Sequence, residues 1–114
     1  MGQVYYVVLD PVVGHEMGGG YARPVVVVSL NWVHQKTGVV TVVPGTTTAA
    51  SYRNVVRVEP TRTNGLTEVT YSRCHQVRSI DESRFTGPAA GRVSQGDLNS
   101  VQQTLWELLR WIGQ

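Results

Sequence analysis

The segment Arg23-Pro24-Val25-Val26-Val27-Val28-Ser29-Leu30 decides the fold of this 114-residue chain. Its four consecutive valines are β-branched, and the run is too short for a core helix. Pro24 has no amide hydrogen to donate to a neighbouring strand, so it fits the beginning of a strand better than the middle. The segment therefore predicts a buried β-strand with Arg23 at its start.

Further strand patterns lie on both sides of this segment. Val4–Leu9 and Val39–Val43 are short apolar runs, whereas apolar and polar residues alternate around Val56–Val58 and Val69–Tyr71. Such alternation indicates antiparallel strands with one face in water. The runs are separated by turn signals at Asn31, Thr37-Gly38, Pro44-Gly45 and Thr63-Asn64-Gly65. The pattern predicts a mainly β fold, a small bent barrel of five to seven strands over about residues 3–93.

The C-terminal residues change to a helical period. Ser94 is followed three residues later by Asp97, which is typical of a helix start. The apolar residues then recur at spacings of three and four: Leu98, Val101, Leu105, Leu108 and Ile112, with Leu109 widening the stripe. We predict a helix over about residues 95–112 whose apolar face packs on the barrel. Trp106 and Trp111 lie beside the stripe, and we expect them to pack rather than to stack on a ligand.

Length and composition limit the class of protein. The chain is long enough for one core, so we expect a single domain over residues 1–114. A net charge of +2 excludes a polycation that coats nucleic acid by charge alone. No apolar stretch approaches the roughly 20 residues of a membrane span. With no signal-peptide pattern and a single cysteine, we expect a soluble cytoplasmic protein without disulfides.

The glycine-rich segment Pro11–Ala22 joins the first two strands and has no hydrophobic period. We expect a mobile loop there, and its glycines match neither a P-loop nor a dinucleotide-binding motif. The chain's histidines and Cys74 lack the spacing of a zinc site, so we expect no metal and no cofactor. We expect Cys74 to be a small buried residue rather than a nucleophile.

Four segments in a fixed order carry the functional information: Gly14-His15-Glu16, Arg23-Pro24, Val43-Pro44-Gly45-Thr46-Thr47-Thr48 and Arg73-Cys74-His75-Gln76-Val77-Arg78-Ser79-Ile80-Asp81. Together they resemble the MazF/PemK family of bacterial toxin endoribonucleases, which includes the Kid toxin. The resemblance extends over nearly the whole chain. It implies a small SH3-like barrel of the MazF/CcdB type with a C-terminal helix, in agreement with the strand and helix patterns.

The resemblance also implies an activity and its partners. The family cuts single-stranded RNA selectively and without metal, through attack of the 2′-OH, leaving a 2′,3′-cyclic phosphate and a 5′-OH. It implies a homodimer and a cognate acidic antitoxin of the MazE/PemI type. Since we find no inhibitory segment in the sequence, we expect inhibition by that separate partner.

The resemblance implies catalytic positions at Arg23 and Thr46. Arg23 corresponds to the arginine of the family's Arg-Pro pair. The residue alone would favour a surface ion pair with Asp10 or Glu16, and the family match reverses that preference. Thr46 is the first of three threonines and corresponds to the functional one. Its hydroxyl can bind a non-bridging oxygen of the scissile phosphate.

The resemblance implies a second catalytic pair at Arg73 and His75. Two residues apart on an extended segment, they should share one face, roughly 6 to 7 Å apart at the backbone. The Kid-like branch has aspartate in place of His75 as the proposed base, and a neutral imidazole is competent for that role near pH 7. Alternatively, Glu16 is the base, or Arg23 and Thr46 are the essential pair. We assign Arg73 to stabilising the phosphorane.

The remaining matched residues are expected to contact RNA or to support the site. The family match assigns RNA contacts to His15, Glu16, Gln76 and Arg78. Asp81 is expected to cap a short helical turn after it.

Two other functions remain open. One is a CcdB-like toxin that poisons gyrase without catalysis, and the other is an SH3-like interaction module. The Arg-Pro pair and Thr46 favour the ribonuclease, and no aromatic-lined groove typical of interaction modules is evident in the sequence.

Overall fold

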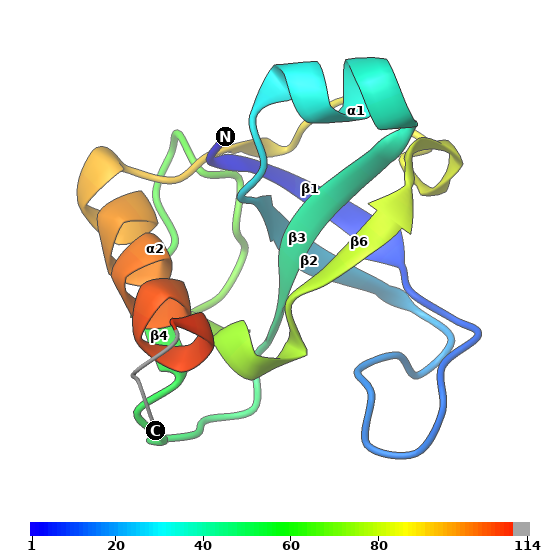
Figure 1. Ribbon diagram of the computed structural model, residues 1–114. Helices are drawn as coiled ribbons and strands as arrows, with labels where there is room; N and C mark the ends of the chain where they lie inside the picture. The colour runs from blue at the N-terminus through cyan, green and yellow to red at the C-terminus, as the bar shows by residue number, and fades with distance from the viewer. Residues whose placement is uncertain (111–114) are drawn as a thin grey trace.

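The computed structural model describes residues 1–110 and consists mainly of antiparallel strands with a helix near the C-terminus (Figure 1). The strands are β1 Gln3–Val8, β2 Ala22–Val27, β3 Val39–Thr46, β4 Val55–Val58, β5 Thr70–Arg73, β6 Arg78–Asp81 and β7 Gly91–Arg92. The α-helices are α1 Asn31–Thr37 and α2 Gln95–Leu109, and the 3₁₀ turns are η1 Cys74–Gln76 and η2 Glu82–Arg84. None of the helices described is long and apolar enough to cross a bilayer.

Strand β3 is the central strand of the sheet and pairs with three other strands. The strand order is β4-β5-β3-β2-β1-β7, with β6 pairing β3 as well. One edge of β3 pairs with β2, with Val25 opposite Pro44. Its other edge pairs first with β6, where Val42 lies opposite Arg78, and then with β5, where Gly45 lies opposite Ser72. This change of partner curls the sheet and confirms the predicted small antiparallel barrel.

The turn predicted at Pro44-Gly45 is wrong, because β3 runs straight through it to Thr46. Pro44 is tolerated because it lies between the last residue paired with β6 and the first paired with β5, where no ladder needs its missing amide hydrogen. Gly45 is required by packing: a Cβ there would lie 2.5 Å from Cγ2 of Thr70.

The turn predicted at Asn31 is also wrong, because the seven residues from Asn31 form α1. No side chain caps its N-terminus, so the usual start signal is missing from the sequence. Its end carries the expected signal, since Gly38 adopts φ of 76° and its amide donates to the carbonyl of His34.

The valine run of β2 is buried on both faces. Val25 and Val27 join one core cluster with Val7, Val42 and others, whereas Val26 belongs to a second cluster with Val4 and others. A strand that is covered on both faces has a continuous run of apolar residues rather than an alternating pattern. Burial of both faces therefore explains the uninterrupted valines of β2.

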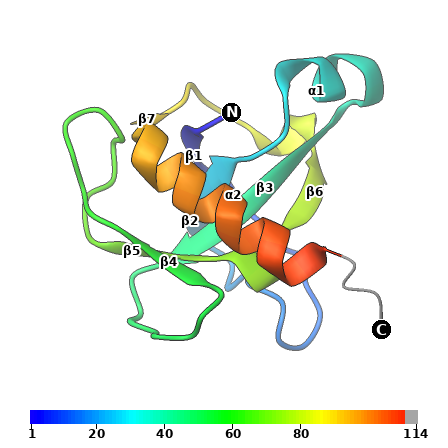
Figure 2. The same cartoon turned by 60° about the vertical axis from the view of Figure 1, so that its left-hand side comes forward.

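Helix α2 begins as predicted, with the Ser94 hydroxyl accepting a hydrogen bond from the amide of Asp97 at 3.0 Å. The helix lies across the sheet (Figure 2), and its own residues Leu98 and Val101 are buried. Leu105 packs against Val43, Cys74 and Val101 as expected. The expected packing of the residues that follow is wrong, since Trp106, Leu108 and Leu109 are 63%, 43% and 67% exposed. The helix ends at Leu109, and the predictions for Trp111 and Ile112 lie outside the described residues.

Candidate active site

A cavity of about 230 Å³ lies where β2 begins and β3 ends. Both Arg23 and Thr46 line it, together with Tyr6, Tyr21, Pro24 and Glu68 among others. Strand pairing explains why Arg23 and Thr46 line the same cavity. Arg23 of β2 lies opposite Val7 of β1, and Val25 of β2 lies opposite Pro44 of β3. The structure thus brings the first predicted catalytic pair together at one end of the sheet.

The Arg23 side chain is already oriented by its surroundings. Its Nε donates to the carbonyl of Gly18, and its guanidinium carbon lies 4.6 Å from the centre of the Tyr21 ring. The alternative surface ion pair with Asp10 or Glu16 does not form. The Asp10 carboxylate instead accepts from the amide of Gly20 at 2.7 Å. The guanidinium therefore keeps its full positive charge available for an anion in the cavity.

Thr46 presents its hydroxyl in a defined direction. The side chain is 9% exposed, and its Oγ1 accepts a hydrogen bond from the amide of Thr48 at 3.2 Å. Because that bond uses a lone pair, the hydroxyl hydrogen stays free to donate to a phosphate oxygen. Thr47 also lines the cavity, but Thr47 and Thr48 are exposed, whereas Thr46 is buried.

The loop between β1 and β2 is tied to the sheet by Gln76. The Gln76 Nε2 donates to the carbonyl of His15 at 3.0 Å, and its Oε1 accepts from the amide of Met17 at 3.2 Å. The loop has no regular secondary structure, as predicted, yet this side chain fixes its middle. Gln76 thus holds the backbone on both sides of Glu16, although neither His15 nor Glu16 lines the cavity of Arg23 and Thr46.

Two arginines hold the beginning of the same loop. Arg78 donates to the carbonyl of Leu9 at 3.3 Å, and Arg84 donates to that of Asp10 at 2.8 Å. Within the loop, the Glu16 carboxylate accepts from the amide of Val13 at 2.6 Å. These bonds give Gln76 and Arg78 a role in positioning the loop, beyond the RNA contacts that the sequence predicted for them.

The assumption that Arg73 and His75 share one face of an extended segment is wrong. Arg73 is the last residue of β5, and His75 lies in the 3₁₀ turn η1. His75 is exposed, and its Nδ1 forms a hydrogen bond with the side-chain nitrogen of Asn54. Neither residue lines the cavity of Arg23 and Thr46. The Nε of Arg73 is buried and has no hydrogen-bond partner among residues 1–110.

Cys74 lies at the point where the chain turns. It is fully buried and packs in a cluster with Val43 and Val101, as the sequence predicted for a small apolar residue. Burial raises the pKa of its thiol to about 11, which makes it a poor nucleophile at neutral pH. Cys74 is also the first residue of the 3₁₀ turn η1, so the buried side chain stands between Arg73 at the end of β5 and the exposed His75.

Two other sequence interpretations can be checked at the site. Asp81 caps η2, accepting from the amide of Ser83 at 2.8 Å, and its hydrogen bonds with Ser83 lower the pKa of the Asp81 carboxyl. In the described part of the chain, no three His, Cys, Asp or Glu side chains gather as metal ligands would.

Sequence reasoning missed a second hollow beside Thr46. It has a volume of about 540 Å³, and its lining includes Tyr52, Arg57 and Tyr71. Tyr71 lies directly opposite Thr46 in the pairing of β3 with β5. The alternation of residues 69–72 identified the strand, but only the pairing register, which the sequence does not show, places Tyr71 next to the candidate active site.

Comparisons with known proteins identify the family of the chain and agree with its fold. A sequence model of the family described as PemK-like, MazF-like toxin of type II toxin-antitoxin system matches residues 1–109. The structure is similar to MazF from Deinococcus radiodurans, at 27% identity and a TM-score of 0.80 over 95% of this chain and 93% of that one.

Two mycobacterial proteins are similar as well. One is an endoribonuclease solved in complex with its cognate antitoxin, at 25% identity and a TM-score of 0.73 over 97% of this chain and 96% of that one. The other is the Mycobacterium tuberculosis toxin MazF-mt6, whose TM-score of 0.74 at 22% identity, over 96% of this chain and 99% of that one, shows a shared fold. No curated protein sequence matched.

Proposed function

The chain belongs to the PemK-like, MazF-like toxins of type II toxin–antitoxin systems, and on this premise we propose that it is a metal-independent, sequence-selective endoribonuclease that cuts single-stranded RNA. The observation that carries the proposal is the cavity in which Arg23 and Thr46 meet. A fixed cation and a free hydroxyl hydrogen in one cavity suit a phosphate that gains charge in the transition state.

In the proposed reaction, the 2′-oxygen of the substrate forms a bond to phosphorus and the bond from phosphorus to the 5′-oxygen breaks. The 2′-OH gives its proton to a base, and the departing 5′-oxygen takes up a proton. Arg23 and Thr46 bind the non-bridging oxygens, and Arg73 adds positive charge nearby. The products are a 2′,3′-cyclic phosphate and a 5′-OH.

The base is either His75 or Glu16. Asn54 can donate to Nδ1 of His75, which leaves the ring proton on Nε2, or its amide can turn and accept from Nδ1, which leaves Nε2 free to accept a proton. Only the second arrangement makes His75 a base without loss of the Asn54 contact. Glu16 is a carboxylate already bonded to the Val13 amide, so it must exchange that bond to act.

The RNA on either side of the scissile phosphate is proposed to lie along the loop and the second hollow. His15, Glu16, Gln76 and Arg78 are the candidates on the loop side. Tyr52 and Tyr71 offer rings on which unpaired bases can stack.

We also propose an acidic antitoxin as partner and a homodimer as the active form. The mycobacterial relative was solved with its cognate antitoxin, which supports the partner. Carboxylates of such a segment would be attracted to the same arginines that bind phosphate. The exposed apolar side chains of Trp106 and Leu109 on α2 support contact with a second copy.

The direct test is incubation of the purified protein with single-stranded RNA in excess EDTA. We expect cleavage to persist, and we expect an RNA with one 2′-deoxynucleotide 5′ to the scissile bond to bind without being cut. Cleavage that vanishes in EDTA and returns with a divalent ion, or normal cleavage of the deoxy substrate, would contradict the mechanism. If the protein cut no RNA at all, the result would favour the alternative function, a gyrase inhibitor of the CcdB type.

The partner has its own test. The uncleavable deoxy substrate and the acidic segment of the antitoxin should exclude one another from the protein. Simultaneous binding of both would show that inhibition does not occur by occupation of the RNA site.

A further inference from the structure

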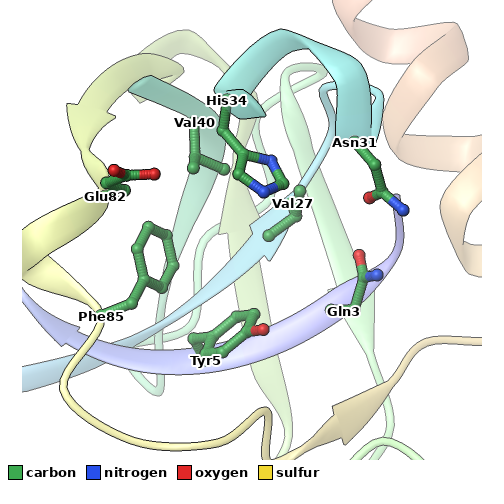
Figure 3. Close-up of a pocket in the computed structure, with 8 residues that line it drawn as sticks. All are labelled: Gln3, Tyr5, Val27, Asn31, His34, Val40, Glu82 and Phe85. Atoms are coloured by element: carbon green, nitrogen blue, oxygen red, sulfur yellow. The ribbon is translucent and has the colours of Figure 1, made fainter. Parts of the chain in front are cut away.

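A third cavity lies at the other end of the central strands, away from Arg23 and Thr46 (Figure 3). It has a volume of about 260 Å³, and its lining includes Gln3 at the start of β1, Val27 at the end of β2 and Val40 near the start of β3. The candidate active site uses the start of β2 and the end of β3. The two cavities therefore lie at opposite ends of the sheet, and nothing in the proposed RNA reaction uses this one.

The floor of this cavity is apolar and aromatic. The rings of Tyr5 and Phe85 meet edge to face, with 4.8 Å between their centres and 76° between their planes. Val27 and Val40 are each 7% exposed and close the base. The cavity thus offers a recess for a flat or slender apolar group, with two aromatic rings against it.

The rim carries a carboxylate without a cation. Figure 3 shows the Glu82 carboxylate projecting over the cavity towards His34. Between residues 1 and 110, the only ion pair joins Arg57 to Glu59. The nearby Arg84 donates to the carbonyls of Val8 and Asp10, so it does not neutralise Glu82. An acidic rim disfavours RNA phosphates, so this cavity is not an extension of the RNA path.

The wall offers further hydrogen-bond acceptors. Gln3 lines the cavity, and its side-chain oxygen is buried without a donor among the described residues. A buried acceptor without a donor is unfavourable, and an N–H group of a ligand could satisfy it. His34 and Asn31 each add one acceptor to the rim.

We propose that this cavity binds a small organic cation, a guanidinium or ammonium group carried on a flat or slender body. Glu82 would pair with the charge, and the Tyr5 and Phe85 rings would hold the cation and its body. The volume lies below the range of about 300 to 1,000 Å³ usual for drug-sized ligands, which favours a small group. The cation belongs either to a free amine or guanidine or to an arginine or lysine side chain of a partner protein.

The first experiment compares phenylguanidine with phenylurea, its neutral analogue of nearly the same shape. Binding is measured by calorimetry and by amide chemical shifts near pH 8, where imidazoles in general are neutral. We expect phenylguanidine to bind at least about 10-fold more tightly, equivalent to about 1.4 kcal/mol. We expect its shifts to centre on Tyr5, Glu82 and Phe85. Equal binding of both probes, or shifts centred on Arg23 and Thr46, would overturn the proposal.

Matched variants locate the site. Glu82→Gln should weaken phenylguanidine binding about 10-fold with little effect on phenylurea, since only the charge is removed. Glu59→Gln removes another exposed carboxylate and should change neither affinity. Phe85→Leu, which keeps an apolar floor, should weaken both probes. An unchanged affinity in Glu82→Gln would refute the role of the carboxylate, and the amide spectrum of each variant verifies its fold.

The last arm distinguishes the two sources of the cation. Agmatine is a free guanidine, whereas N-acetyl-arginine-N-methylamide presents the same group as a protein side chain does. Binding of both would support an arginine of a partner protein, and binding of agmatine alone would support a free small molecule. Failure of both to bind would overturn the proposal. Because no RNA is used, these results do not depend on the proposed ribonuclease activity.

Discussion

The two halves of the candidate active site are held in place by different kinds of structure. Arg23 and Thr46 lie on adjoining strands, so strand pairing fixes how they meet. Arg73 ends β5, where it pairs with Val55 of β4, whereas His75 lies in the 3₁₀ turn η1 that begins with the buried Cys74. The first, strand-held half therefore rests on strand pairing alone, whereas the second, turn-held half also contains a short turn that begins with a buried residue.

This difference leads us to expect the largest loss of activity in the strand-held half. Arg23→Ala and Thr46→Val should each lower kcat/KM for RNA cleavage about 100- to 1,000-fold, because each removes a donor to the transition state. The fold should persist, since Arg23 is only half-buried and Thr46→Val keeps its volume. Single-turnover cleavage of a defined RNA measures the effect.

The controls are Arg62→Ala and Thr48→Val, which remove an exposed arginine and an exposed threonine hydroxyl. Both should retain nearly full activity. If Arg23→Ala and Arg62→Ala were equally active, the first cavity would not be the active site.

The same difference explains what the sequence could predict. The valine run predicted β2, although the strand ends at Val27 rather than at Leu30, and the Arg-Pro pair placed Arg23 near its beginning. Residues on neighbouring strands then meet as a consequence of antiparallel pairing. The sequence also predicted the Ser94 cap and the buried Cys74.

The failures have a common physical reason. The sequence shows that Arg73 follows an alternating strand, but it does not show that the partner of β3 changes from β5 to β6 at that point. Such a change requires a turn, and a turn of a few residues redirects every side chain in it. For the same reason the sequence could not show that Tyr71 lies opposite Thr46, because the pairing register depends on contacts between residues distant in sequence.

The second prediction concerns His75 in the turn-held half. If it is the base, His75→Ala should lower the rate about 100-fold and remove the acidic limb of the pH–rate profile. Asn54→Asp should move that limb to higher pH, because a carboxylate beside Nδ1 favours the protonated ring. An acidic limb that stays in place in both variants would transfer the role to Glu16, and Glu16→Gln should then remove it.

The third prediction concerns the loop that spans both halves. Gln76→Ala removes the bonds to His15 and Met17, so the loop should lose its fixed position and cleavage should fall about 10-fold. Hydrogen exchange at the Met17 amide should accelerate in parallel, since its acceptor is gone. Gln103→Ala, on the exposed face of α2, is the control for both measurements. A slower cleavage without faster exchange would mean that Gln76 acts on RNA directly rather than through the loop.

The smallest effect is expected at Cys74, which anchors the turn-held half. Burial raises the pKa of its thiol from 9.0 to about 11, so the folded protein keeps a proton that the unfolded chain releases. The thiol therefore lowers the free energy of unfolding progressively between about pH 9 and pH 11, and has no such effect below pH 9.

Cys74→Ala should remove this pH dependence while costing about 1 kcal/mol at neutral pH through the space left beside Val43 and Val101. Tyrosines also titrate in this range, so the informative quantity is the difference between wild type and variant in urea unfolding at each pH. Parallel curves for the two proteins would show that the turn opens enough for the thiolate to reach water, and that burial of Cys74 does not hold Arg73 and His75 in place.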